Sequence, residues 1–197
     1  MKQQIILASA SPRRKELLDQ INVNYIVYPV DIDETPKQAE GAQDYVIRVA
    51  AEKSAACIKA VNSPLPVLAA DTSVVIDGLI LGKPENETHA AEMLNQLSGK
   101  THCVYSAISL RTGGALSEQT HYQALSVTEV SFRHITSKEI KAYWQTSEPE
   151  GKAGGYAIQG IASIFVESIK GSFSGVVGLP LFETAELLSK QGITIST

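Results

Sequence analysis

The fold is indicated first by the stretch Gln4-Ile5-Ile6-Leu7-Ala8-Ser9-Ala10-Ser11-Pro12-Arg13-Arg14. Its short apolar run, Gln4–Ala8, is typical of a buried strand and leads directly into a helix start. Ser11 can cap that helix, and Pro12 then occupies its first position. The chain therefore opens with a strand that is followed at once by a helix.

Strand-like and helix-like segments continue to alternate along the chain, and no internal repeat is visible. The clearest helix has an apolar stripe that runs from Val46 to Ala60. The expected helices are Gln43–Val61, Glu87–Leu97, Ser137–Trp144 and Pro180–Lys190. The expected strands are Val23–Val30, Pro66–Asp71, Val74–Ile76, Leu79–Leu81, Lys100–Arg111, Leu116–Phe132 and Ile164–Ile169. Turns at Asp77-Gly78 and Gly113-Gly114 predict hairpins, which interrupt an all-parallel winding, so the expected class is α/β with a mixed sheet.

Composition excludes several classes of protein. The 197 residues fit one domain, and 44% hydrophobic with 19% charged residues is ordinary for a globular chain. A net charge of −4, from 17 Lys+Arg and 21 Asp+Glu, argues against a protein that coats nucleic acid. The two cysteines, Cys57 and Cys103, form no CxxC pair, which indicates neither a disulfide scaffold nor a zinc site and favours a reducing compartment. No apolar stretch approaches the ~20 residues of a membrane span, so a cytoplasmic protein is expected.

The first helix carries cations where acids normally lie. Arg13 and Arg14 fall in its first turn and Lys15 follows, although a helix N-terminus has partial positive charge. Each misplaced cation costs ~0.3–1 kcal/mol unless an anion offsets it. The side chains therefore indicate a bound anion, a carboxylate from elsewhere in the fold, or a simply solvated basic helix end.

Two further side chains stand out. Lys53 lies on the apolar stripe of its helix, where a cation needs a partner or a ligand unless its stem carries the ammonium to the surface. Asp71 ends the apolar run that begins at Pro66, and a carboxylate beyond a strand end suits metal binding or general-base chemistry. A turn or capping aspartate is the alternative interpretation.

Lys83 and an acidic loop offer weaker signals. Lys83, in Gly82-Lys83-Pro84, either reaches a phosphate or belongs to an ordinary turn. Asp31, Asp33 and Glu34 either hold Mg²⁺ together with phosphate oxygens or form a solvated loop. The sequence contains neither GxxxxGK[ST] nor GxGxxG. The residues alone therefore indicate Mg²⁺-assisted chemistry on a phosphate-bearing small molecule.

Five blocks, in this order, resemble the Maf proteins. They are Ser9-Ala10-Ser11-Pro12-Arg13-Arg14, Ala69-Ala70-Asp71-Thr72, Gly82-Lys83-Pro84, Lys152-Ala153-Gly154-Gly155-Tyr156-Ala157-Ile158-Gln159-Gly160 and Val177-Gly178-Leu179-Pro180-Leu181. The resemblance covers about Ile5 to Leu188. It implies a single Maf-like domain over residues 1–197, with a long, twisted mixed sheet flanked by helices. Two lobes around a cleft are implied too, as in inosine triphosphate pyrophosphatases.

The resemblance also implies an activity. Maf proteins are nucleoside triphosphate pyrophosphatases that release a nucleoside monophosphate and pyrophosphate, need a divalent cation (Mg²⁺ or Mn²⁺), and are usually cytoplasmic homodimers. Carried over by position, Asp71 is the catalytic residue, while Arg13, Thr72 and Gln159 govern substrate choice. The phosphates are expected on Ser11, Arg13, Arg14, Lys53 and Lys83, and the metal on Glu34 and Asp71. Asp71 either positions the attacking water or deprotonates it.

Gln159 allows an inference about the nucleobase. Uracil and thymine present an acceptor beside a donor, and one carboxamide can pair with both, whereas a Glu would suit guanine. The block around Gln159 resembles the branch that acts on dTTP and UTP, so a dTTP/UTP pyrophosphatase is expected. The alternatives are a non-catalytic, nucleotide-binding regulator of septum formation and a purine-directed pyrophosphatase. A pure sensor would have no use for Asp71 beside a basic cluster.

Overall fold

The computed structural model describes residues 3–61, 63–112 and 120–195. The strands are β1 (Ile5–Leu7), β2 (Tyr25–Val27), β3 (Val67–Ile76), β4 (Leu79–Leu81), β5 (Thr101–Arg111), β6 (His121–Phe132) and β7 (Val166–Lys170). The helices are α1 (Pro12–Gln20), α2 (Ala42–Ala60), α3 (Glu87–Leu97), α4 (Ser137–Trp144), α5 (Phe173–Val177) and α6 (Leu181–Ser189), with 3-10 turns η2 (Ala153–Gly155) and η3 (Ile161–Phe165).

One mixed sheet organises the molecule, as predicted. Its strand order is β2-β1-β3-β5-β6-β7, and β4 pairs with β3 beside this path. The β1–β2 and β1–β3 pairs are parallel, whereas the other pairs are antiparallel. Asp77 and Gly78 turn β3 into β4 with φ values of 51° and 80°, which is the geometry that favours this dipeptide in a hairpin.

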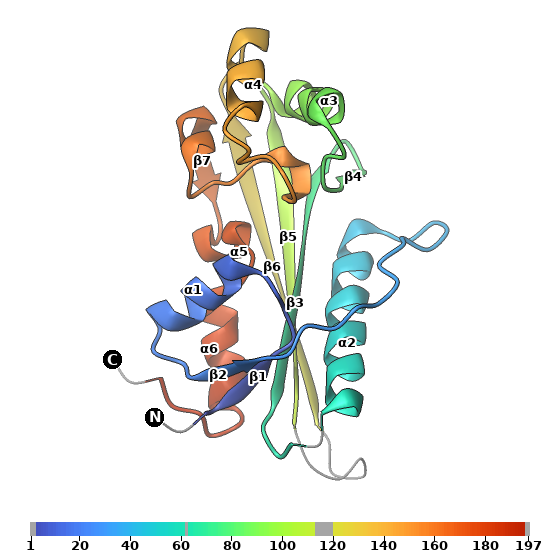
Figure 1. Ribbon diagram of the computed structural model, residues 1–197, viewed down its shortest axis with the longest axis vertical. Helices are drawn as coiled ribbons and strands as arrows, with labels where there is room; N and C mark the ends of the chain where they lie inside the picture. The colour runs from blue at the N-terminus through green and yellow to red at the C-terminus, as the bar shows by residue number, and fades with distance from the viewer. Residues whose placement is uncertain (1–2, 62, 113–119, 196–197) are drawn as a thin grey trace.

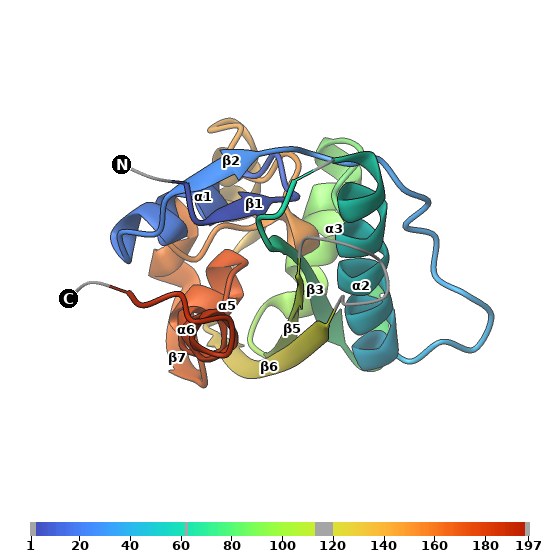
Figure 2. The ribbon, with the colours of Figure 1, turned by 90° about the horizontal axis from the view of Figure 1, so that it is seen from below.

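Three long strands carry two groups of elements. In Figure 1, β3, β5 and β6 run the length of the molecule, with α3, α4 and β4 at one end and β1, β2, α1, α2 and α6 at the other. We call these ends the upper and lower lobes. Seen from below, α2 covers one face of the long strands, and α5 and α6 lie on the other side (Figure 2). One apolar core contains side chains from both lobes, including Leu18, Leu68, Leu94, Phe132 and Leu188.

The predicted helices agree with the structure except at their ends. In α2 the buried side chains include Val46, Val49, Ala50, Lys53 and Cys57, which confirms the stripe. Its last residue, Ala60, is exposed. The stripe is buried because α2 packs against β3 and β5.

Several expectations about strands were wrong. Asp71 does not end a strand but lies inside β3, which continues to Ile76. Nearly all of β3 is buried, so no polar alternation marked its length, and the polar triplet at 71–73 was taken for a boundary. The strand expected over Val23–Val30 forms only at Tyr25–Val27. The strand expected over Ile164–Ile169 begins at Val166, after η3, and the short helix α5 was not predicted. The expected Gly113-Gly114 turn and residues 116–119 of the expected strand lie outside the described residues.

Candidate functional site

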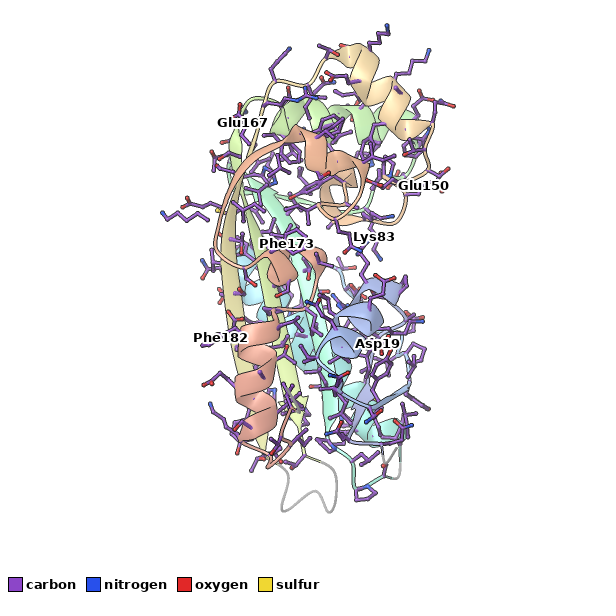
Figure 3. The ribbon with its side chains drawn as sticks, turned by 90° about the vertical axis from the view of Figure 1, so that its left-hand side faces the viewer. Asp19, Lys83, Glu150, Glu167, Phe173 and Phe182 are labelled. Carbon is purple, nitrogen blue, oxygen red and sulfur yellow. The ribbon has the colours of Figure 1, made fainter. Side chains whose placement is uncertain are left out.

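A cavity of about 950 Å³ lies between the two lobes. Figure 3 shows Lys83 at this boundary, above α1. The nine residues predicted for the site all line this cavity: Ser11, Arg13, Arg14, Glu34, Lys53, Asp71, Thr72, Lys83 and Gln159. They come from α1, the loop before α2, α2 itself, β3, the turn after β4 and the segment after η2. The fold thus brings together positions that are up to 148 residues apart in the chain.

The two arginines of α1 are held by the end of another helix. Arg13 Nε donates to the carbonyl of Val177 at 3.3 Å, and Arg14 Nε donates to that of Gly178 at 2.9 Å. These carbonyls belong to the last residue of α5 and to its C-cap, where a helix carries partial negative charge. Arg14 also donates to Ser9 Oγ at 3.1 Å.

No carboxylate of the described residues forms an ion pair with these guanidinium groups. Among the described residues none lies within 4 Å of either one, so the carboxylate alternative is wrong for this part of the chain. Burial lowers the pKa of Arg14, Asp71 opposes this shift, and Arg13 adds to it. Burial also lowers the pKa of Arg13. The α1 start therefore concentrates incompletely neutralised positive charge on one wall of the cavity.

Lys53 joins the two carboxylates of the site. Its Nζ lies 2.9 Å from Asp71 Oδ1 and 3.0 Å from Glu34 Oε1. Lys53 is 9% exposed and Asp71 6% exposed, so the lysine does not carry its charge to the surface. The expectation that this inner cation needs a partner is confirmed, and the alternative of a snorkelling side chain is wrong. Lys53 Nζ donates a hydrogen bond to Asp71 Oδ1, and no hydrogen bond to Asp71 Oδ2 is found among the described residues.

The hydroxyl of Thr72 is oriented by β5. Ser106 donates to the carbonyl of Gly175 at 2.6 Å, which uses the only hydrogen of its hydroxyl. Thr72 Oγ1 lies 2.9 Å from Ser106 Oγ, so Thr72 is the donor in that contact. Its oxygen lone pairs therefore remain for any group in the cavity.

Gln159 and Lys83 lie on the upper side of the site. Both side chains are exposed along the cavity wall. Gln159 Nε2 donates to Glu16 Oε2 of α1 at 3.4 Å, a long contact that spans the two lobes. The backbone N–H of Gly154 donates to the carbonyl of Gly82 at 2.9 Å, and so links the turn that carries Lys83 to η2. Gly154 has φ +68°, and a Cβ there would lie 3.0 Å from Val74, so this close approach requires glycine.

Glu34 and Asp71 suit a divalent ion that is shared with a ligand. Their oxygens converge on one cation, the ammonium of Lys53, as they would on Mg²⁺. Magnesium is usually bound by one or two carboxylates together with phosphate oxygens and water, so this donor set fits. The described part of the chain contains no group of three or more His, Cys, Asp or Glu able to hold a metal. An ion here would therefore need oxygen atoms from water or a ligand.

Comparison with known families identifies the family of the chain. The model of the family described as Maf-like protein matches residues 4–191. The chain belongs to the Maf family. The predicted resemblance is thereby confirmed over nearly the whole Maf chain.

Curated relatives of this Maf chain share its length as well as its sequence. A protein of Methylococcus capsulatus named dTTP/UTP pyrophosphatase is 53% identical over 189 residues, covering 96% of this chain and 91% of the relative. A protein of Nitrosomonas europaea with the same name is 50% identical and covers 97% of this chain and 96% of the relative. Among solved structures, the Staphylococcus aureus Ham1 protein matches with a TM-score of 0.43 and 19% identity, over 66% of this chain and 72% of that chain.

Sequence reasoning missed several parts of the Maf site. Tyr45 of α2 lines the cavity, and burial, followed by the charges of Asp71 and Glu34, raises its pKa to about 12. Nothing in the spacing of α2 distinguished it from other aromatic residues. The carbonyls of Val177 and Gly178 were missed as arginine acceptors, although the block that contains them had been noticed. The role of Ser106 depends on strand register, which the sequence did not give.

Proposed function

We propose that this Maf protein hydrolyses dTTP and UTP to the nucleoside monophosphate and pyrophosphate. The observation that carries the proposal is the carboxylate of Asp71, held by Lys53 in a cavity that is also lined by two arginines with no carboxylate ion-pair partner among the described residues. The names of the curated relatives support the choice of substrates, and they give no support to a non-catalytic regulator.

The triphosphate would lie across the basic wall. Arg13 and Arg14 use their Nε atoms on carbonyls, and Arg14 gives one further N–H to Ser9, which leaves other guanidinium N–H groups to bind phosphate oxygens, whose geometry guanidinium forks match well. The hydroxyl of Ser11 and the backbone N–H groups in the first turn of α1, which has no side-chain cap, would add neutral donors. Lys83 would contact the chain of phosphates from the upper lobe, and Lys53 from below.

Glu34 and Asp71 would hold a divalent ion, Mg²⁺ or Mn²⁺. Such an ion would supply positive charge that neutralises the phosphates and stabilises the departing pyrophosphate. Lys53 lies between the same two carboxylates, so its ammonium and the ion compete for their oxygens. From the cavity wall, the ammonium of Lys53 would also donate to a phosphate oxygen.

Asp71 would act on water. Its Oδ1 is engaged by Lys53, so Oδ2 is the oxygen that receives the hydrogen bond of the attacking water. The water oxygen attacks the α-phosphorus, the bond from that phosphorus to the bridging oxygen breaks, and pyrophosphate leaves with the electron pair. The proton of the water passes to Asp71 or, with Asp71 only positioning the nucleophile, to solvent.

Gln159 would recognise the base. Its contact with Glu16 directs Nε2 toward α1, so Oε1 is free to accept from N3–H of uracil or thymine and the second N–H can donate to O4. Thr72 offers only lone pairs to the cavity, so it would accept from a donor of the nucleotide. The pairing offered by Gln159 favours pyrimidines that carry an N3–H group.

The decisive experiment measures pyrophosphate release from a panel of dTTP, UTP, CTP and GTP in the presence of Mg²⁺. The wild type is compared with Asp71→Asn and with a matched control, Asp77→Asn, in the exposed hairpin turn of the same strand. We expect turnover of dTTP and UTP by the wild type and the control, and none by Asp71→Asn. Nucleotide binding without pyrophosphate release would support the regulator instead, and a preference for GTP would contradict the assignment of the base.

Further expectations belong to the same proposal. The chain folds as one domain, in keeping with the apolar core shared by both lobes. It forms a homodimer and acts in the cytoplasm without binding nucleic acid or membranes. No helix among the described residues is long and apolar enough to cross a membrane. Size-exclusion chromatography with light scattering would test the dimer.

A further inference from the structure

Gln159 lies in a tight turn whose backbone is unusually well anchored. The N–H of Gly160 donates to the carbonyl of Ala157 at 3.0 Å, which makes Gln159 the third residue of a four-residue turn. Ala157 and Ile158 are buried, whereas the Gln159 side chain is exposed at the cavity. The position of its amide therefore depends on what holds this turn in place.

Tyr143 of α4 holds the first residue of the turn. Its phenol oxygen accepts from the N–H of Ala157 at 3.2 Å and donates its own hydrogen to Glu148 Oε1 at 2.7 Å. Tyr143 is 2% exposed, and its burial raises the pKa of the phenol, so the hydroxyl hydrogen stays in place. One buried hydroxyl thus joins the turn to a carboxylate.

Glu148 holds the residues that follow the turn. Its Oε2 accepts from the N–H of Ile161 at 2.9 Å, and its Oε1 accepts from that of Ala162 at 3.1 Å. Burial acts to raise the pKa of Glu148, but the hydrogen bonds from Ile161, Tyr143 and Ala162 help to lower it, so the carboxylate is ionised. A Cβ at Gly160 would overlap this carboxylate, so the close approach requires glycine.

Neither Tyr143 nor Glu148 lines the cavity, yet their hydrogen bonds fix the backbone on both sides of Gln159. We propose that Glu148 and Tyr143 are positioning residues that set the nucleobase discrimination of the site by holding the amide of Gln159. This inference rests on the proposed function. Recognition by paired hydrogen bonds requires an amide placed within about 0.5 Å, and a turn that drifts or rotates would let the amide match cytosine as well.

The test uses Glu148→Gln and Tyr143→Phe, with Glu139→Gln as the matched control. Glu139, on α4, is likewise a carboxylate that accepts several hydrogen bonds, from Thr136 and Arg133, but none of these involves the turn. Glu148→Gln keeps one acceptor oxygen, and Tyr143→Phe removes only the hydroxyl, so at least one variant retains the fold. The readouts are kcat and KM for dTTP, UTP and CTP, together with the thermal midpoint.

We expect the ratio of kcat/KM for dTTP to that for CTP to fall about tenfold in both variants, the effect of one lost hydrogen bond. The loss resides in KM, and kcat for dTTP changes less than twofold, because the Asp71 region is untouched. Glu139→Gln lowers the thermal midpoint without changing the ratio. The inference is overturned if Glu148→Gln and Tyr143→Phe behave like Glu139→Gln.

A failure of the proposed function would be recognised separately. A wild type that releases no pyrophosphate from dTTP or UTP rejects the pyrophosphatase assignment. In that case the ratio of the dissociation constants for dTTP and CTP, measured on the same four proteins, decides the inference. A ratio of the dTTP constant to the CTP constant that rises in Glu148→Gln and Tyr143→Phe but not in Glu139→Gln supports the inference, and a ratio that stays constant in all four proteins overturns it.

Discussion

His102 of β5 makes the stability of the fold depend on pH. It is 2% exposed, and its Nε2 lies 2.8 Å from the hydroxyl of Tyr156. The ring of Phe132 packs edge-on against it, with 4.9 Å between the two ring centroids. Nδ1 has no hydrogen-bond partner among the described residues. Burial lowers the pKa of His102 from 6.5 to about 4, because the charged imidazolium has no compensating partner there.

The sign and size of the effect follow from this shift. Below pH 6.5 the unfolded chain binds a proton at His102 that the folded protein does not bind until about pH 4, so stability falls as the pH falls. Each pKa unit corresponds to about 1.4 kcal/mol. Between pH 8 and pH 5 the folded state should lose about 2 kcal/mol through His102 alone, rising to about 3 kcal/mol below pH 4.

Urea unfolding of the wild type and of His102→Gln at pH 8 and pH 5 isolates this contribution. Glutamine does not titrate but can still pair with Tyr156, and the other titrating groups contribute equally to both proteins. We expect the wild type to lose about 2 kcal/mol more than the variant over this range. A difference below about 0.5 kcal/mol would show that His102 titrates normally in the folded protein.

The remaining predictions concern the site itself. Asp71→Asn should abolish pyrophosphate release yet unfold cooperatively at a midpoint only a few degrees lower, because Lys53 keeps its contact with Glu34; residual turnover above a tenth of the wild type's would contradict its catalytic role. Lys53→Met leaves the carboxylates of Asp71 and Glu34 without their shared cation and should lower the free energy of unfolding in urea by about 3–5 kcal/mol. Added Mg²⁺ should restore part of this loss, and a free energy of unfolding that does not change with Mg²⁺ would count against the metal position. Gln159→Glu should raise kcat/KM for GTP relative to dTTP about tenfold or more, since a carboxylate accepts but cannot donate; an unchanged ratio would remove Gln159 from base recognition.

Much of the fold was predictable because it is governed by local patterns. The α2 stripe and the hairpin dipeptide at Asp77-Gly78 each depend on spacing within one segment, and both are confirmed. The extent of β3 was not predictable in the same way. A strand buried along both faces shows no alternation, and the polar residues that interrupt it face the cavity rather than a turn.

The residues of the candidate site likewise differ in whether a local sequence signal reveals them. Arg14 and Lys53 could be singled out because each charge lies where its own helix disfavours it, and both line the cavity. Glu148 has no such local signal, because its hydrogen-bond donors are backbone N–H groups 13 and 14 residues further along the chain. Side chains that bind the backbone of a distant loop become recognisable only when the loop has been placed.

The arginines of α1 show how a local conflict is resolved by a distant element. A bound anion was one explanation for cations at a helix start, and the structure supplies another set of acceptors, the carbonyls at the end of α5. These carbonyls accept only from the Nε atoms of Arg13 and Arg14. Arg14 donates one further N–H to Ser9. The guanidinium planes are thereby fixed before any ligand arrives, and their outer N–H groups keep their charge for it. Donors that are already oriented need no reorganisation when charge develops on a ligand. The hydrogen bonds from the arginines to the α5 carbonyls therefore strengthen the argument for an anion site at α1.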